Sequence, residues 1–388
     1  TVTNPYGHGL AAEKILKDRD GEYACRGEGE YPILDFCRRA CAGESLDNIP
    51  NIWTRHNGKI IKNPMRPVMV NLEELPFPDY SLFDEQAIYR PMQGKIWRTV
   101  GLETQRGCPY TCTYCNSPSQ NILAKTEQNS HFYRKKSLER IRREIEDVHK
   151  KHNVELIYML TDTFLALTKK EFDGLVEMYS DFRIPFWMNT RAETMDRYRA
   201  EGLEKMNMLR MSFGIEHGNP QYRLKMLRRR VSNEVMIKGF EACRDLNFVT
   251  TGNCIIGMPD ENRNLAFDTI NFCRQLPDYV EQTGAFIFAP FHGTELRDIA
   301  VEKGYYDPNL ICDIEDPASS MLDQTNFPKP EVIGLSKTFG LYQKVPKSEW
   351  KWVEKAEKDT KKGRKIFEQF QHDYILSQQS EILEPLDH

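Results

Sequence analysis

From residue 98 onward, short apolar runs alternate with longer stretches in which apolar residues recur every three or four positions. The first pattern predicts buried β-strands and the second predicts amphipathic helices. The predicted strands are residues 98–105, 154–160, 184–190, 208–216, 248–257 and 283–291. The predicted helices are residues 137–152, 168–181, 195–205, 219–246, 263–275 and 294–303.

Strands that alternate with helices indicate βαβ units, and these units build a parallel sheet. We therefore expect an α/β fold. Six repeats fit a partial or complete β/α barrel better than an open, doubly wound sheet, although the number of strands does not by itself decide between them.

The regions on either side of this repeat have other patterns. The N-terminal region predicts a short helix at 10–19, a strand-like stretch at 23–31 with a tight turn at its glycines, a helix at 32–43, and a hairpin that turns at Asn57–Gly58. Residues 72–84, LEELPFPDYSLFD, contain two prolines and predict a packed, extended linker.

Beyond residue 305 the strand pattern stops, and helices are predicted at 331–345 and 347–378 as a cover over the barrel. With a boundary placed near residue 95, the predicted units are 1–70, 71–95, 96–305 and 306–388.

The overall composition excludes several classes of protein. The 388 residues are 40% hydrophobic and 28% charged, with a net charge of -4, which is ordinary for a soluble protein and gives no basic surface for nucleic acid. No apolar run approaches the roughly 18 residues of a membrane span. The N-terminus also lacks the pattern of a signal peptide, so we expect a cytoplasmic protein.

Ten cysteines are too few, in so long a chain, for a secreted disulfide framework. Seven of them are scattered, and we interpret them as small buried apolar residues. Cys37 and Cys41 lie four residues apart on a predicted helix, without a third metal ligand nearby.

The other three, Cys108, Cys112 and Cys115, lie within eight residues, directly after a predicted strand. Soft thiolates select zinc, copper(I) or iron–sulfur clusters. A structural zinc site needs a fourth ligand, for which His131 is the only nearby candidate. Three ligands would instead leave one iron of a cubane cluster open to a substrate.

The segment RGCPYTCTYC resembles the CxxxCxxC motif of the radical S-adenosylmethionine superfamily, and residues 98–305 resemble its partial (β/α)6 barrel. The resemblance implies a [4Fe–4S] cluster on Cys108, Cys112 and Cys115, with S-adenosylmethionine chelating the open iron. Reductive cleavage would release a 5′-deoxyadenosyl radical, which abstracts hydrogen from the substrate.

The resemblance also assigns positions at the strand ends. Asp162 would bind the amino group of S-adenosylmethionine, and Arg191 could pair with its carboxylate. Ser212 and Glu216 resemble the strand that meets the ribose and carboxylate. The remaining assignments are Tyr114 and Asn253 near the adenine, with His217 where a serine is usual and Asp260 where a glutamate is usual.

The N-terminal segment RGEGE, the LPFPDYSLF linker and residues 283–304 resemble the cobalamin-binding branch of this superfamily. A doubly wound cobalamin domain needs about 100–150 residues, but only about 70 precede the linker. His8 is more typical of a loop residue than of a cobalt ligand. Because the first residue is Thr1, we expect a Rossmann-like domain that has lost its front part, with a naturally reduced variant as the alternative.

Three functions follow. The first is a cobalamin-linked radical enzyme, either a methyltransferase or a cyclase-like enzyme. The second is a cobalamin-independent radical enzyme, and the third is a non-catalytic zinc-binding protein. For an enzyme we expect a small-molecule or natural-product substrate and an external one-electron reductant such as flavodoxin or ferredoxin. Candidates for the pocket lining are Tyr158, Trp187, Phe291 and His292, although core packing explains these aromatic residues equally well.

Overall fold

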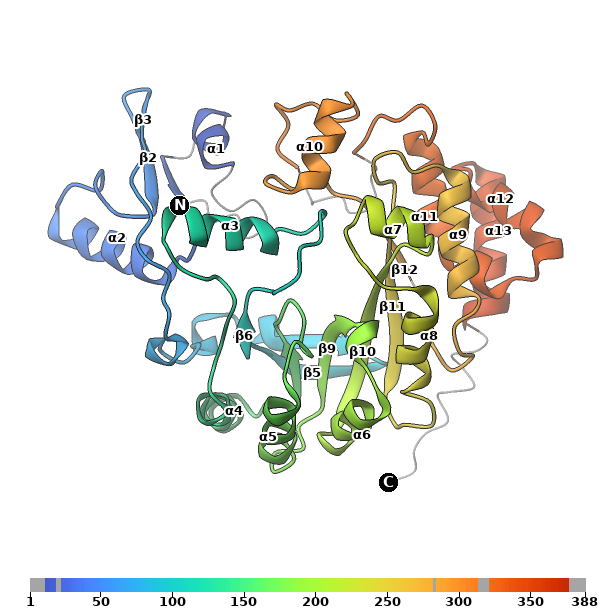
Figure 1. Ribbon diagram of the computed structural model, residues 1–388, viewed down its shortest axis with the longest axis horizontal. Helices are drawn as coiled ribbons and strands as arrows, with labels where there is room; N and C mark the ends of the chain where they lie inside the picture. Colours follow the sequence, from blue (N-terminus) through green and yellow to red (C-terminus); the bar gives the residue numbers. More distant parts are fainter. Residues whose placement is uncertain (1–10, 19–21, 282–283, 313–320, 377–388) are drawn as a thin grey trace.

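A seven-stranded sheet dominates the computed structural model, which describes residues 11–18, 22–281, 284–312 and 321–376 (Figure 1). Its strand order is β12-β11-β10-β9-β8-β5-β4. The strands are β4 (Tyr89–Met92), β5 (Lys95–Leu102), β8 (Leu156–Met159), β9 (Phe186–Arg191), β10 (Met208–Glu216), β11 (Val249–Ile256) and β12 (Gly284–Ile287). All neighbours pair in parallel except β4 and β5, which form an antiparallel hairpin at one edge.

The sheet curls into a half-barrel, as the sequence predicts, with six parallel strands. Helices along its outer side are α4 (Leu138–His152), α5 (Lys169–Tyr179), α6 (Arg197–Lys205), α8 (Asn233–Glu241) and α9 (Arg263–Cys273) (Figure 1). Alternate residues of the central strands, such as Ile157 and Met159 of β8, are fully buried against these helices. The remaining residues of each strand face the inside of the curl, where a site can form.

The sheet also extends beyond the predicted boundary at residue 95, because β4 belongs to it. In the predicted linker, three short 3₁₀ turns occupy Leu72–Glu74, Tyr80–Leu82 and Glu85–Ile88. The side chains of Asn71, Asp79 and Asp84 cap them by accepting a backbone hydrogen bond two residues on. Local capping therefore orders a segment whose prolines exclude a longer helix.

The N-terminal unit holds α1 (Ala12–Asp18), α2 (Glu30–Ala42) and a separate antiparallel sheet of β1 (Tyr23–Cys25), β2 (Ile52–His56) and β3 (Lys59–Ile61). The predicted hairpin is confirmed, with Asn57 and Gly58 both at positive φ in its turn. The predicted strand at 23–31 is shorter than expected, because Gly27 at φ 72° turns the chain and α2 begins at Glu30. The three strands of this small sheet are antiparallel, and His8 lies outside the described residues.

Several elements lie where no regular structure is predicted. They are α3 (Ser117–Glu127), directly after the cysteines, and the two-residue strands β6 (Gln105–Arg106) and β7 (Arg134–Lys135), which pair with each other. The predicted helical region 219–246 contains a shorter helix, α7 (Pro220–Lys225), then a turn and α8.

The C-terminal region is helical, as predicted. It comprises α10 (Glu295–Glu302), α11 (Lys329–Lys344), a 3₁₀ turn at Lys347–Glu349, α12 (Trp350–Glu357), α13 (Lys361–Gln371) and a π-turn at His372–Leu376. The helix expected from 347 onward is interrupted between α12 and α13. Figure 1 shows α11 to α13 beside α9, at the β12 edge of the sheet. In the described part of the chain, no helix is long and apolar enough to cross a membrane.

Candidate active site

A cavity of about 550 Å³ lies at the carboxyl ends of the parallel strands. This is the end at which β/α barrels build their sites. All nine positions assigned from the sequence line it: Cys108, Cys112, Tyr114, Cys115, Asp162, Arg191, Ser212, Glu216 and Asn253. The strand register explains part of this convergence, because Arg191 of β9 and Asn253 of β11 both lie opposite Gly214 of β10.

The loop that carries the cysteines runs from β6 to α3 and is anchored along its length. Gly107 has φ 83°, and a Cβ there would lie 2.8 Å from a ring carbon of Phe132 and 3.2 Å from its carbonyl oxygen. The Asn121 amide donates to the Cys108 carbonyl at 2.9 Å. Thr113 accepts a backbone bond from Leu296 N at 3.0 Å. These contacts anchor the loop to Phe132, to α3 and to Leu296.

Each of the three thiols has a polar neighbour. The Thr163 hydroxyl lies 3.4 Å from Cys108 Sγ, and the Arg191 guanidinium donates to Cys112 Sγ at 3.2 Å. The Ser117 backbone N–H donates to Cys115 Sγ at 3.5 Å. Burial raises the pKa of Cys115 to about 12 and also raises the pKa of Cys108. Both groups are therefore thiols in the metal-free protein, and a bound cluster would release their protons.

The arrangement fits a cluster rather than a single ion. Across the described residues, no group of three or more histidine, cysteine, aspartate or glutamate side chains is placed to hold one metal ion. His131, the one candidate for a fourth zinc ligand, is exposed and does not line the cavity. Three cysteines that line one cavity are the ligand set that leaves one iron of a cubane cluster open, so the residues present fit such a cluster.

A chain of alternating charges runs from the cysteine loop across the site. Arg191 donates to Cys112 and also binds Glu193 at 2.7 Å. Glu193 accepts from Arg229 at 3.3 Å, and Arg229 donates to Glu216 at 2.9 Å. The side chain of Arg229 is 1% exposed, so it is a buried cation held between two carboxylates. Arg229 and Glu193 are absent from the sequence prediction, because no spacing links residue 229 to residues 193 and 216.

Glu216 is the last residue in this series of alternating charges and accepts a hydrogen bond from Arg229. It has φ 64°, a conformation that non-glycine residues adopt rarely and that turns its carboxylate toward Arg229. Burial raises the pKa of Glu216, and the positive charge of Arg229 opposes that shift. Tyr114 lies beside it, and burial raises the pKa of this phenol well above its usual value.

Two further positions are fixed by neighbours on other elements. The Ser117 hydroxyl at the start of α3 donates to Asp162. The side chain of Ser212 accepts from the Trp187 indole at 3.3 Å, and Trp187 stacks on Tyr158 at 4.4 Å between ring centroids. Tyr158 and Trp187 do not line the cavity themselves but form a rigid support beneath it. Phe291 lines the cavity, whereas His292 does not.

Neither Asp260, which stands where the resemblance usually has a glutamate, nor its neighbour Glu261 lines the cavity. Asp260 is partly exposed and binds Lys303 at 2.8 Å. Glu261 is fully buried, accepts the Met258 backbone N–H at 3.0 Å and faces His217 Nε2 at 3.3 Å. His217 does not reach the cavity, so it makes no hydroxyl-like contact there.

Comparison with known proteins agrees with this geometry. Residues 102–273 match the family model of the radical SAM superfamily. An uncharacterized methyltransferase of Pyrococcus horikoshii is 27% identical over 283 residues, covering 71% of this chain and 57% of the relative. An anaerobic magnesium-protoporphyrin IX monomethyl ester cyclase of Rubrivivax gelatinosus is 26% identical over 260 residues, covering 64% and 44%.

Two solved structures share the fold. The cobalamin-dependent S-adenosylmethionine radical enzyme OxsB has a TM-score of 0.61 at 16% identity, covering 95% of this chain and 56% of that one. The radical S-adenosylmethionine methyltransferase TsrM of Kitasatospora setae has a TM-score of 0.54 at 16% identity, covering 73% and 54%.

The half-barrel and its cysteine-lined cavity therefore define a radical SAM domain, the class that takes a [4Fe–4S] cluster and S-adenosylmethionine. Residues 102–273, the part of the chain that matches this family, contain all three cysteines of the loop. It spans about half the length of the curated relatives it matches.

Proposed function

We propose that this chain is a radical SAM enzyme that cleaves S-adenosylmethionine at a [4Fe–4S] cluster and transfers a methyl group, or closes a ring, with the help of cobalamin. The observation that carries the proposal is the single cavity in which three thiols, without a fourth ligand, meet a buried array of charged residues. When bound, the cluster would supply one electron to the sulfonium of S-adenosylmethionine.

The residues of this chain have distinct roles in the proposal. Cys108, Cys112 and Cys115 would hold the cluster. Asp162 would accept the amino group of S-adenosylmethionine, and Arg191 would face its carboxylate while also donating to the Cys112 sulfur. The remaining cofactor contacts would come from Ser212, Glu216, Tyr114 and Asn253.

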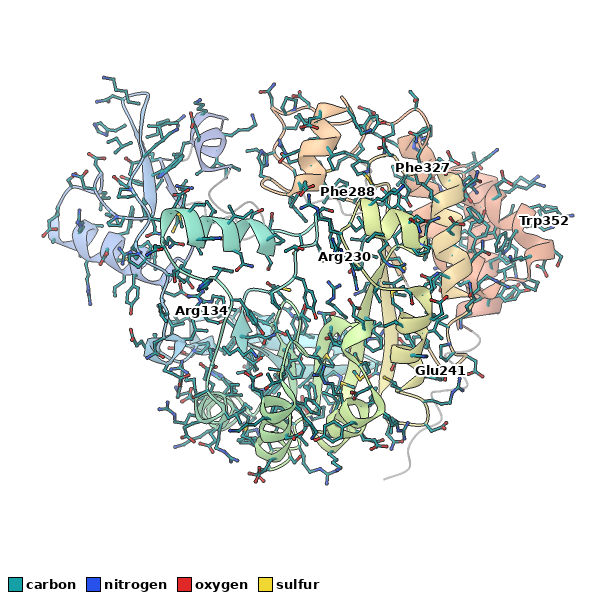
Figure 2. All side chains as sticks on the ribbon, viewed as in Figure 1. Arg134, Arg230, Glu241, Phe288, Phe327 and Trp352 are labelled. Carbon is teal, nitrogen blue, oxygen red and sulfur yellow. The ribbon has the colours of Figure 1, made fainter. Side chains whose placement is uncertain are left out.

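The exposed apolar residue Phe286 of β12 lies at the same cavity, together with the buried Phe288 (Figure 2). An apolar wall beside a polar cofactor site would bind the substrate and keep water from the reactive species. We infer a small-molecule substrate and an external reductant such as flavodoxin or ferredoxin. A cytoplasmic location agrees with the lack of disulfide bonds among the cysteines that the structure describes.

The link to cobalamin rests on the RGEGE segment, the linker and the shared fold of the cobalamin-dependent enzyme OxsB over 95% of this chain. The second candidate is a cobalamin-independent enzyme that only abstracts hydrogen, using the same cysteine-lined cavity.

One experiment separates these candidates. The protein is reconstituted anaerobically with iron and sulfide, reduced, and incubated with S-adenosylmethionine with and without hydroxocobalamin. The proposal predicts 5′-deoxyadenosine or S-adenosylhomocysteine in amounts that cobalamin increases. Formation of 5′-deoxyadenosine that is indifferent to cobalamin supports the second candidate, whereas no cleavage by a loaded cluster contradicts both. C112A, which removes one ligand, is the negative control.

A further inference from the structure

The N-terminal unit contacts the base of the cysteine loop through one carboxylate. Glu28, in the turn between β1 and α2, has a side chain that is 14% exposed. It accepts from Arg106 at 2.6 Å and, through both oxygens, from Arg134 at 2.7 and 3.1 Å. It also accepts the backbone N–H of Met69 at 3.1 Å. All of these contacts join segments that are distant in sequence.

The two arginines stand at the entrance to the cysteine loop. Arg106 ends β6, two residues before Cys108, and it lies directly opposite Arg134 in the β6–β7 ladder. Two cations facing each other across a strand pair repel, so the ladder needs an anion between them. Glu28 is that anion. Figure 2 shows Arg134 below α3, on the side of the barrel nearest the N-terminal unit.

A second ion pair holds the end of α3, the helix that follows the cysteine loop. Arg26 donates to Glu127, the last residue of α3, from its two terminal nitrogens, Nη1 at 3.0 Å and Nη2 at 2.9 Å. The Gln128 amide donates to the Arg66 carbonyl at 2.6 Å. The segment Arg26–Glu28 thus contacts the chain on both sides of the cysteines, where it enters the loop and where it leaves α3.

We infer that Glu28 is a positioning residue for the iron–sulfur cluster. It neutralises Arg106 and Arg134 and so holds together the strand pair β6–β7, after which the cysteine loop begins. The inference rests on the proposed function and deepens it, because it gives the RGEGE segment a role in this chain. Glu28 does not line the cavity and touches neither cofactor nor substrate.

Loss of the Glu28 charge would leave Arg106 with other carboxylates but would leave Arg134 without one among the described residues. Arg106 keeps Glu103 at 2.9 and 3.0 Å and Glu30 at 2.8 Å. Among the described residues, Arg134 would keep the backbone carbonyls of Phe132 and Met69 and the Phe132 ring, 5.2 Å away, but no carboxylate, and its side chain is 7% exposed. A buried arginine without a counter-charge is unfavourable, so β7 would shift toward solvent and release β6.

The test compares E28Q with wild type after anaerobic reconstitution. The measured quantities are iron per chain, the rate at which a chelator removes that iron, and the midpoint potential and EPR signal of the reduced cluster with and without S-adenosylmethionine. The matched control is E357Q, because Glu357 is a buried carboxylate held bidentately by Arg263 at 2.7 and 3.0 Å, far from the cysteines.

We expect E28Q to lose iron to the chelator at least about tenfold faster than E357Q and to show a shifted potential and EPR signal. E28D, which keeps the charge, should recover part of both effects. If E28Q matches E357Q in all four readouts, the inference is overturned while the proposed function stands. If wild type itself binds no cluster, the proposed function fails first.

A variant that does not fold would leave the rate unmeasured, so R134K is the second probe. Lysine keeps the charge but cannot make the bidentate contact with Glu28. R134K should also lose iron faster than E357Q, and a wild-type rate in R134K would overturn the inference.

Discussion

Removal of Arg229 should destabilise the protein strongly, because this guanidinium is the buried counter-charge of Glu216. The side chain is 1% exposed and donates to Glu216 at 2.9 Å and to Glu193 at 3.3 Å. In R229M, Glu193 keeps Arg191, whereas the structure gives Glu216 no other cation within ion-pair distance among the described residues. Stranding one partner of a buried ion pair costs about 3–5 kcal/mol.

The double variant R229M/E216Q makes this expectation specific. With the carboxylate replaced by a neutral amide, no buried charge is left without a partner at residue 216. We expect the double variant to recover about 2–3 kcal/mol relative to R229M, a coupling in the range found for residues in direct contact. Lost packing around the arginine stem accounts for the part that is not recovered.

The assay is urea unfolding of the reduced, cluster-free protein, followed by tryptophan fluorescence. For an m-value of about 3 kcal/mol per molar, R229M should lower the midpoint by roughly 1–1.7 M, and R229M/E216Q should restore more than half of that shift. If R229M costs less than about 1 kcal/mol, or if the two substitutions act additively, then Arg229 does not hold the charge of Glu216 and the alternating chain is wrong.

Three other predictions concern the cysteine loop and its support. C108A, C112A and C115A should each abolish a stable cluster by iron and sulfide analysis, whereas C37S, at an exposed cysteine, should leave it intact; a cluster that survives any of the three would contradict the ligand assignment. G107A should lower stability by about 1–3 kcal/mol in thermal or urea unfolding, because φ is 83° and the new Cβ would lie 2.8 Å from Phe132; a neutral effect would mean that the loop adapts. Burial raises the pKa of Glu28, but Arg134 and Arg106 outweigh it and leave that pKa below the ordinary 4.5. A lowered folded-state pKa contributes stability that is fully present above about pH 4.5 and is lost as the pH falls through the folded-state pKa. The difference in unfolding free energy between wild type and E28Q should therefore shrink on acidification. A difference that does not depend on pH would contradict the ion pairs of Glu28.

The sequence predicts the barrel well because its strands are apolar and buried. Short apolar runs such as LIYM in β8 are typical of strands buried inside a parallel sheet. Their parallel order follows from the helices that connect successive strands. The elements that the sequence does not predict are polar or very short. Helix α3, SPSQNILAKTE, lacks a clear apolar face, and β6 and β7 have two residues each.

The candidate site divides in the same way. The cysteines and the strand-end residues follow a motif along the chain, and the strand register brings them to one cavity. Arg229, Glu193 and Glu28 act through ion pairs between distant segments, and a local pattern cannot encode those pairings.

The central claim is that three cysteines of this chain hold a [4Fe–4S] cluster with one iron open to S-adenosylmethionine. The most direct measurement is the EPR spectrum of the reduced, reconstituted protein before and after addition of S-adenosylmethionine, with metal analysis on the same sample. We predict about four irons per chain, no stoichiometric zinc, and a cluster signal that changes when S-adenosylmethionine binds. A cluster signal indifferent to S-adenosylmethionine, or one zinc per chain without iron, would contradict the account.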